Sequence, residues 1–127
     1  MAYPTGTGTE VLKRTTIHAQ SNTNTSFRWD GTMATTGTSS YTVTALHIIT
    51  VLSVIATEQG SAAELINMYM VDGSNNISIF SSQALGSLGT FVWNDKFVLI
   101  GGDKLAVNTE SGANVDFLCS YIDQDWS

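Results

Sequence analysis

The sequence predicts an all-β fold: a single-domain antiparallel β-sandwich, jelly-roll-like, with an extended N-terminal arm. Charged residues make up only 13% of the 127 residues, about half the usual share of roughly 25%. Thr, Ser, Asn and Gly take their place, and these residues suit strands and tight turns. From residue 56 onward, turn signals recur about every 8 to 12 residues, which is the spacing expected of a sandwich or jelly roll.

The chain divides into a short N-terminal part and a sandwich. Residues 1–9 alternate Thr and Gly after Tyr3-Pro4, so they offer little to bury and predict an arm that orders on a partner. The next segment, to His18, has two mixed faces, which indicates an edge strand or a strand paired with another subunit. We therefore expect an arm and first edge strand over residues 1–18 and a β-sandwich domain over residues 19–127.

The most regular strand signal lies between Leu46 and Ile55. Six of these ten residues are β-branched, and both faces of the segment are apolar. β-branched residues favour strands over helices, and apolar residues on both faces favour a strand inside the protein. The segment is predicted to be a central buried strand.

Residues 61–80 admit two interpretations. Good helix formers over residues 61–69 favour a helix, whereas the alternation that follows and the turn sequence DGSNN (residues 72–76) favour a β-hairpin, which we predict. Residues 81–90 are expected to form a loop. A second hairpin is expected over residues 91–100, with its turn at 94–96, and a last strand is expected to place Val115, Phe117, Cys119 and Tyr121 on one face.

Charge and hydropathy exclude two classes of partner. Five basic residues against eleven acidic ones give a net charge of -6, whereas nucleic-acid binding needs clustered Lys and Arg. The most hydrophobic stretch, residues 45–56, is shorter than the ~20 apolar residues of a spanning helix, and the N-terminus lacks the pattern of a secretory signal. We expect no nucleic-acid partner and no membrane partner.

The ionisable residues do not form a catalytic pattern. His18 and His47 are the only histidines, and His47 lies in an apolar strand, where a hydrogen-bonded structural role is expected. Cys119, in an apolar alternating run, is expected to be buried, and nothing near it lowers a thiol pKa. We therefore predict that the chain is not an enzyme and has no catalytic residues.

Metal and cofactor motifs are also missing from the sequence. Asp72, Ser74 and Asn76 resemble part of a calcium loop, but the position of the bidentate Glu is occupied by Gln83. A hairpin turn explains the same residues. One Cys and two distant His cannot supply the paired ligands of a structural zinc site, so we expect neither a metal nor a cofactor.

The three tryptophans differ in context. Trp93 stands between Val92 and a turn, which favours packing at the end of a strand. Trp29 and Trp126 lie beside polar segments, so they are candidates for an interface or for sugar stacking, with local packing equally compatible.

Two regions of the sequence carry a resemblance to known proteins. The C-terminal half, with GGDKLAV (residues 101–107) followed by a Gly/Asn turn and VDFLCSYI (residues 115–122), resembles small β-sandwich virion proteins of tailed bacteriophages. The opening GTGTEVLKR (residues 6–14) looks like the extended arm of such proteins. As a pattern, the resemblance covers most of residues 41–122.

The resemblance implies a virion structural protein, specifically a capsid decoration (cement) protein. It implies a homo-oligomer, expected to be a trimer, on the outer capsid surface, where it ties major capsid protein subunits together by several contacts. A tail, connector or fibre-associated virion protein, and a receptor- or carbohydrate-binding module, remain the alternatives. The residues expected to contact the capsid or a neighbouring subunit are Tyr3, Pro4, Val11, Leu12, Lys13, Arg14 and Trp29.

Overall fold

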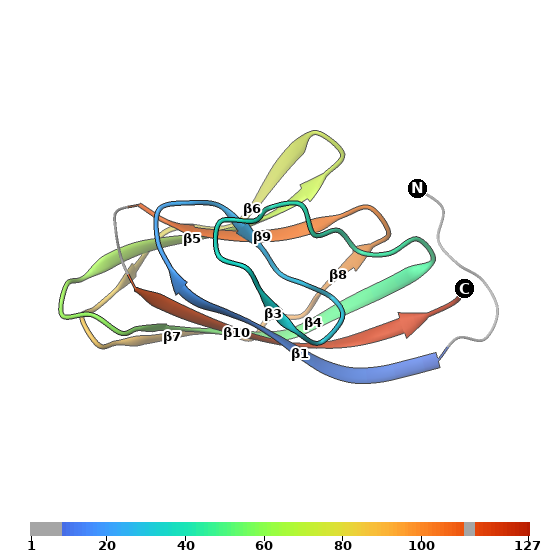
Figure 1. Ribbon diagram of the computed structural model, residues 1–127, viewed down its shortest axis with the longest axis horizontal. Coiled ribbons are helices and arrows are strands. Elements are labelled where there is room, and N and C mark those ends of the chain that lie inside the picture. Colours follow the sequence, from blue (N-terminus) through green and yellow to red (C-terminus); the bar gives the residue numbers. More distant parts are fainter. Residues whose placement is uncertain (1–8, 111–113) are drawn as a thin grey trace.

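A computed structural model describes residues 9–110 and 114–127, and these form two β-sheets packed face to face (Figure 1). One sheet has six strands in the order β3-β1-β10-β4-β7, with β8 also paired to β4, and the other has the order β2-β9-β5-β6. The strands are β1 (Thr9–Gln20), β2 (Thr25–Ser26), β3 (Met33–Ala34), β4 (His47–Glu58), β5 (Glu64–Asp72), β6 (Asn75–Leu85), β7 (Thr90–Trp93), β8 (Phe97–Ile100), β9 (Lys104–Thr109) and β10 (Val115–Asp125).

The strand order is that of a jelly roll. If β7 and β8 count as one interrupted strand and the short β3 is set aside, the eight strands in chain order are β1, β2, β4, β5, β6, β7/β8, β9 and β10. The first, eighth, third and sixth form one sheet, and the second, seventh, fourth and fifth form the other. The predicted all-β, jelly-roll-like antiparallel sandwich is therefore confirmed. The part of the arm before Thr9 lies outside the described residues.

The core lies between the two sheets. Along β10 the inward residues Val115, Phe117, Cys119 and Tyr121 are fully buried, and they alternate with half-exposed outward residues. The period of two therefore assigns one side of the strand to the core, as the sequence predicts. Burial raises the pKa of the Cys119 thiol far above its ordinary value, which keeps the thiol protonated.

The hairpin predicted over residues 61–80 is confirmed. β5 and β6 pair antiparallel from Glu64 to Asp72, and Asp72 lies opposite Asn75. This leaves the two-residue loop Gly73-Ser74, in which Gly73 has φ 63°. Positive φ at the first loop position is the requirement that a type II′ turn places on glycine.

Two expectations about residues 81–100 are wrong. β6 continues through Ser81 to Leu85, so the first half of the expected loop is strand. β7 and β8 do not pair with each other, because both pair with β4, β8 along Ile48–Val51 and β7 along Val54–Thr57. Residues 94–96 are therefore an interruption of one edge strand, and the chain does not fold back on itself there.

The first strand belongs to the sandwich throughout its described length. β1 pairs with β10 from Thr9 onward and reaches Gln20, two residues beyond the expected boundary at residue 18. On its other side only Thr16 and Ile17 pair with β3. β1 thus lies close to an open edge of the sheet, in agreement with its mixed faces. The described residues include no helix long and apolar enough to cross a membrane.

Candidate functional site

The six-stranded sheet presents a broad apolar surface on the side away from the core. Directly opposed residues in a sheet point to the same side, so the strand registers define this surface. Leu12 lies opposite Ile122, Leu118 opposite Ile55, and Ile48 opposite Ile100. We call this surface the outer face, and its apolar residues are Leu12, Ile48, Ile55, Val92, Val98, Ile100, Leu118 and Ile122.

The apolar side chains of the outer face lie in two rows that cross four strands, and each row includes one Thr. One row runs from Thr16 through Leu118 and Ile55 to Val92, from β1 to β7. A second row runs from Leu12 through Ile122 and Thr50 to Val98, from β1 to β8. Arg14, Ser120 and Ser53 lie between the two rows. Apolar side chains gathered on one outward sheet face indicate an interaction site.

Few charges lie on the outer face. Arg14 and His18 project from β1, and Glu10 and Asp116 accompany them at the two ends. His18 Nδ1 lies 2.8 Å from Asp116 Oδ1, and the same oxygen accepts a hydrogen bond from the Ala19 N–H at 2.9 Å. The face thus carries two carboxylates, one guanidinium and one imidazole, with Glu10, His18 and Asp116 near its ends and Arg14 on β1 between the two rows. Polar groups around an apolar centre are typical of the rim of a protein interface.

A hollow opens on the outer face beside the margin of β1. Its volume is about 360 Å³, and Met33, Ile55 and Leu118 supply apolar walls, with His18 and Asp116 also lining it. Met33 belongs to the short β3 and is 58% exposed. A hollow of this kind suits an apolar side chain projecting from a partner.

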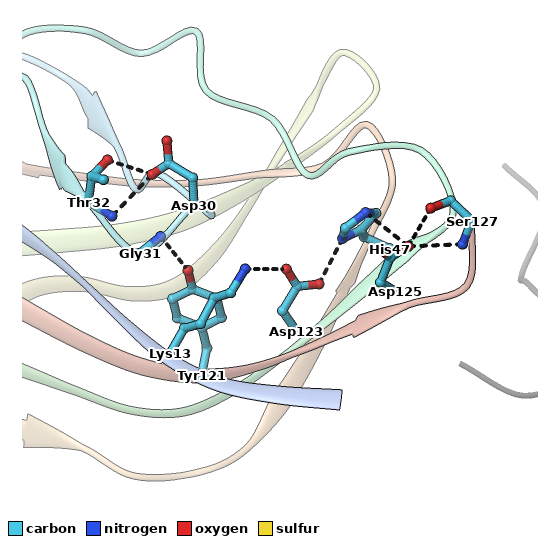
Figure 2. A network of polar contacts seen from close by, with 9 residues as sticks. All are labelled: Lys13, Asp30, Gly31, Thr32, His47, Tyr121, Asp123, Asp125 and Ser127. Carbon is cyan, nitrogen blue, oxygen red and sulfur yellow. Dashed lines mark hydrogen bonds and ion pairs between the residues drawn. The ribbon is translucent and has the colours of Figure 1, made fainter. Parts of the chain in front are cut away.

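A polar network lies on the core-facing side of the same sheet, near the C-terminal end of β10 (Figure 2). Asp123 on β10 is 4% exposed, and its two oxygens lie 3.1 Å from Lys13 Nζ and 2.8 Å from His47 Nδ1. A buried carboxylate needs such partners because burial removes its hydration. The network therefore joins β1, β10 and the start of β4, and the expected hydrogen-bonded structural role of His47 agrees with these contacts.

The network continues to the C-terminal residues. His47 Nε2 lies 3.3 Å from Asp125 Oδ1, and that oxygen also accepts hydrogen bonds from the Ser127 hydroxyl and N–H. The hydrogen bonds from Ser127 lower the pKa of Asp125 below its ordinary value, with smaller contributions from His47 and Lys13. Because the Ser127 hydroxyl bonds Asp125, the contacts hold the chain end in place. The described residues contain no group of three or more His, Cys, Asp or Glu able to hold a metal ion.

Tyr121 links the core to the loop that follows β2. Its hydroxyl oxygen accepts a hydrogen bond from the Gly31 N–H at 3.1 Å (Figure 2). Desolvation by burial raises the pKa of Tyr121 to about 12. Next to it, the side-chain hydrogen bond from Thr32 is the largest of the interactions that lower the pKa of Asp30. These bonds fix the position of the loop over the end of the sandwich.

The predicted contact residues fall into different environments. Tyr3 and Pro4 lie outside the described residues. Leu12, which is 72% exposed, and Arg14 lie on the outer face. Val11 and Lys13 project from the opposite side of β1, where Lys13 forms its ion pair with Asp123.

Trp29, one of the predicted contact residues, lies in the core, which agrees with the local packing that the sequence left open. Trp29 is 9% exposed and packs in the core, where its ring is T-shaped against Tyr121 with the centroids 4.9 Å apart. Its neighbour Phe27 is also fully buried. The flanking polar sequence is misleading because the loop folds over the open end of the sandwich and carries these rings inward. Trp126 is half-buried, and its backbone N–H donates a hydrogen bond to the Leu46 carbonyl at 3.0 Å.

Most of the outer face was missed by reasoning from the sequence. A signal was present in residues 46–55, whose two faces are both apolar although a sandwich strand needs only one apolar face. The structure places Ile49 and Val51 in the core and leaves Ile48 and Ile55 half-exposed on the outer face. The second apolar face of this segment therefore marks the outer face as a candidate contact surface. The outward Leu118 and Ile122 of β10 carry the same signal.

Comparisons with known proteins do not identify a family for this chain. No family model matches the chain, and no curated protein sequence matches it. A solved structure titled "Structure of infectious bursal disease virus Gx strain" aligns with 89% of this chain at 11% identity and a TM-score of 0.38. The alignment covers 35% of that chain, so this chain spans about a third of its length. A TM-score this low does not establish a common fold.

Proposed function

We propose that this chain is a virion structural protein, a capsid decoration protein that binds the outer surface of a phage capsid and stabilises contacts between major capsid protein subunits. The observation that carries the proposal is the outer face, because a jelly roll with a second apolar sheet face is suited to assembly. Jelly rolls also serve as lectin domains and cupins, so the fold alone does not decide. The sequence resemblance to phage virion proteins supports the choice.

In this proposal the N-terminal segment reaches the capsid. Tyr3 and Pro4 precede β1, and Arg14 projects from β1 near the open edge of the sheet. The segments of one oligomer act together, because after the first has bound the others bind at a high effective concentration. Lys13 is committed to Asp123, so the basic side chain left for a partner in this segment is Arg14.

The direct test is cosedimentation of the purified chain with capsids that lack it. The proposal predicts saturable binding, with greater resistance of the decorated capsids to heat. A variant lacking residues 1–8 keeps the whole of β1 and its ion pair, so it separates loss of capsid binding from loss of folding. A full-length chain that folds but does not bind capsids overturns the proposal.

A second candidate function, a carbohydrate-binding module, is favoured by one hollow. It has a volume of about 310 Å³ and lies where the Arg28 guanidinium carbon is 5.0 Å from the centre of the Tyr41 ring. Asp30 and the hydroxyls of Ser40 and Thr42 also line it, and such groups hydrogen-bond sugars. Glycan-array binding that is lost in Tyr41→Ala, together with failure to bind capsids, would favour this function.

A further inference from the structure

We propose that the outer face is covered by a second copy of this chain, and that this contact forms before the protein meets a capsid. This inference rests on the proposed function in one respect: a decoration protein exists as a free chain before it binds a capsid. The alternative occupant is the major capsid protein itself. Three features of the outer face favour a second copy.

The first feature is the apolar character of the outer face. Interfaces between permanently associated subunits resemble a protein core, whereas partners that exist separately meet through more polar surfaces. Rows such as Leu118-Ile55-Val92 resemble a core in this sense. A free chain that exposed these rows would aggregate, and another copy is the partner present at equal concentration from synthesis onward.

The second feature is charge. The chain has a net charge of -6, so two copies repel each other through most of their surfaces. On the outer face Arg14 and His18 stand beside Glu10 and Asp116, and the remaining acidic residues lie elsewhere. The outer face carries two of the eleven acidic residues together with Arg14, so two copies that meet through it bring fewer unbalanced carboxylates together than they would through the rest of their surfaces.

The third feature is size. With about 4.8 Å between strands and about 3.4 Å per residue, four strands of about eight residues give a flat area on the order of 500 Å². Two such faces together reach on the order of 1,000 Å², and the side chains add relief to the flat area. Stable interfaces bury about 1,200–2,000 Å² in total. The flat estimate lies below that range but reaches the roughly 1,000 Å² that a specific interface needs as a minimum, and the hollow beside Met33 can receive a side chain of the second copy.

The test uses single cysteines at positions matched for exposure in the isolated chain. Val98 on the outer face is 51% exposed and Ile77 on β6 is 49% exposed, and a second pair, Leu12 and Leu88, is 72% and 70% exposed. The buried Cys119 contributes little background. Each of Val98→Cys, Ile77→Cys, Leu12→Cys and Leu88→Cys is treated with a thiol reagent at micromolar concentration without capsids, and its mass is measured by sedimentation.

If the inference holds, Val98→Cys and Leu12→Cys react at least about tenfold more slowly than their controls, which corresponds to less than about a tenth of the face being free. The difference in thiol reaction rate between each variant and its control disappears in denaturant and when the protein is diluted until it is monomeric. Equal rates within each pair, or a monomeric wild-type chain, overturn the inference. A monomer that still binds capsids refutes this inference alone, whereas a protected oligomer that does not bind capsids refutes the proposed function alone.

Discussion

Leu118 on β10 lies directly opposite Ile55 on β4, and both side chains point away from the sandwich core. Their inward neighbours, Phe117 and Ala56, also lie opposite each other and are buried between the sheets. The two central strands are therefore apolar on both sides, although the described part of the chain packs a second sheet against only one of them. This arrangement underlies the proposed role in assembly.

Replacing Ile55 with Asp is expected to weaken self-association. Ile55→Asp puts a charge in the middle of an apolar row, where desolvation of the carboxylate in an interface costs several kcal/mol. Sedimentation velocity should show a shift toward the monomer, with an unchanged β-rich circular dichroism spectrum. The control is Leu88→Asp, which adds the same charge at an exposed loop position between β6 and β7, outside the strands that form the outer face. Equal oligomer masses for both variants would contradict this prediction.

Removing the lysine partner of Asp123 is expected to destabilise the fold. Lys13→Met keeps most of the side-chain volume but leaves the 4%-exposed Asp123 with His47 alone. Loss of one charged partner should lower the free energy of unfolding by about 1–3 kcal/mol, as measured by urea denaturation. Lys96→Met, in the exposed segment between β7 and β8, should change it by less than about 0.5 kcal/mol. An unchanged free energy of unfolding in Lys13→Met would show that the ion pair does not contribute to stability.

Tyr121→Phe is expected to change the pH dependence of stability. The folded-state pKa of about 12 exceeds the unfolded value of about 10. The stabilising effect of the neutral phenol is therefore complete below pH ~10 and is lost as the pH rises toward 12, by on the order of 2 kcal/mol. At pH 7 the variant should be less stable by about 1 kcal/mol, because the Gly31 bond is lost.

Above pH ~10 the wild-type chain should lose stability faster than Tyr121→Phe, so the two unfolding curves should converge or cross. Chemical denaturation followed by tryptophan fluorescence at pH 7, 9, 10 and 11 measures this difference. A constant difference between the two proteins across that range would show that Tyr121 does not titrate in a buried site.

Trp29→Ala is expected to destabilise the sandwich. The indole is buried against Tyr121 and Phe27, and truncation of a buried aromatic side chain costs about 3–5 kcal/mol. Thermal unfolding should therefore begin at a clearly lower temperature. Trp29→Phe, which keeps part of the packing, should lose much less. Wild-type stability of Trp29→Ala would show that the Trp29 ring does not pack in the core.

The sequence predicted the fold class well because alternation and turn chemistry are local signals. The Gly73-Ser74 turn fixed one hairpin, and the inward series on β10 was visible as a period of two. The pairing of β7 and β8 with β4 was not predicted, because sequence neighbours with a turn between them normally pair with each other. Which strands share an edge depends on contacts far apart in the chain.

The outer face was predicted only in part. Leu12 and Arg14, two of the predicted contact residues, lie on it, whereas Trp29 lies in the core, because its polar neighbours do not reveal that the loop folds inward. Ile48 and Ile55 were interpreted as buried, since an apolar side chain covered by its own chain and one covered by a partner look alike in a sequence. The strand order is needed to see that the six-stranded sheet has two apolar faces and that the other sheet covers only one of them.

A cryo-electron microscopy reconstruction of capsids saturated with the purified chain tests the proposed assembly. We predict sandwich-shaped density on the capsid exterior, with the outer face of each six-stranded sheet against another copy of the chain and the N-terminal segment against major capsid protein. A reconstruction without added density, or with the outer faces turned toward solvent, would contradict the account.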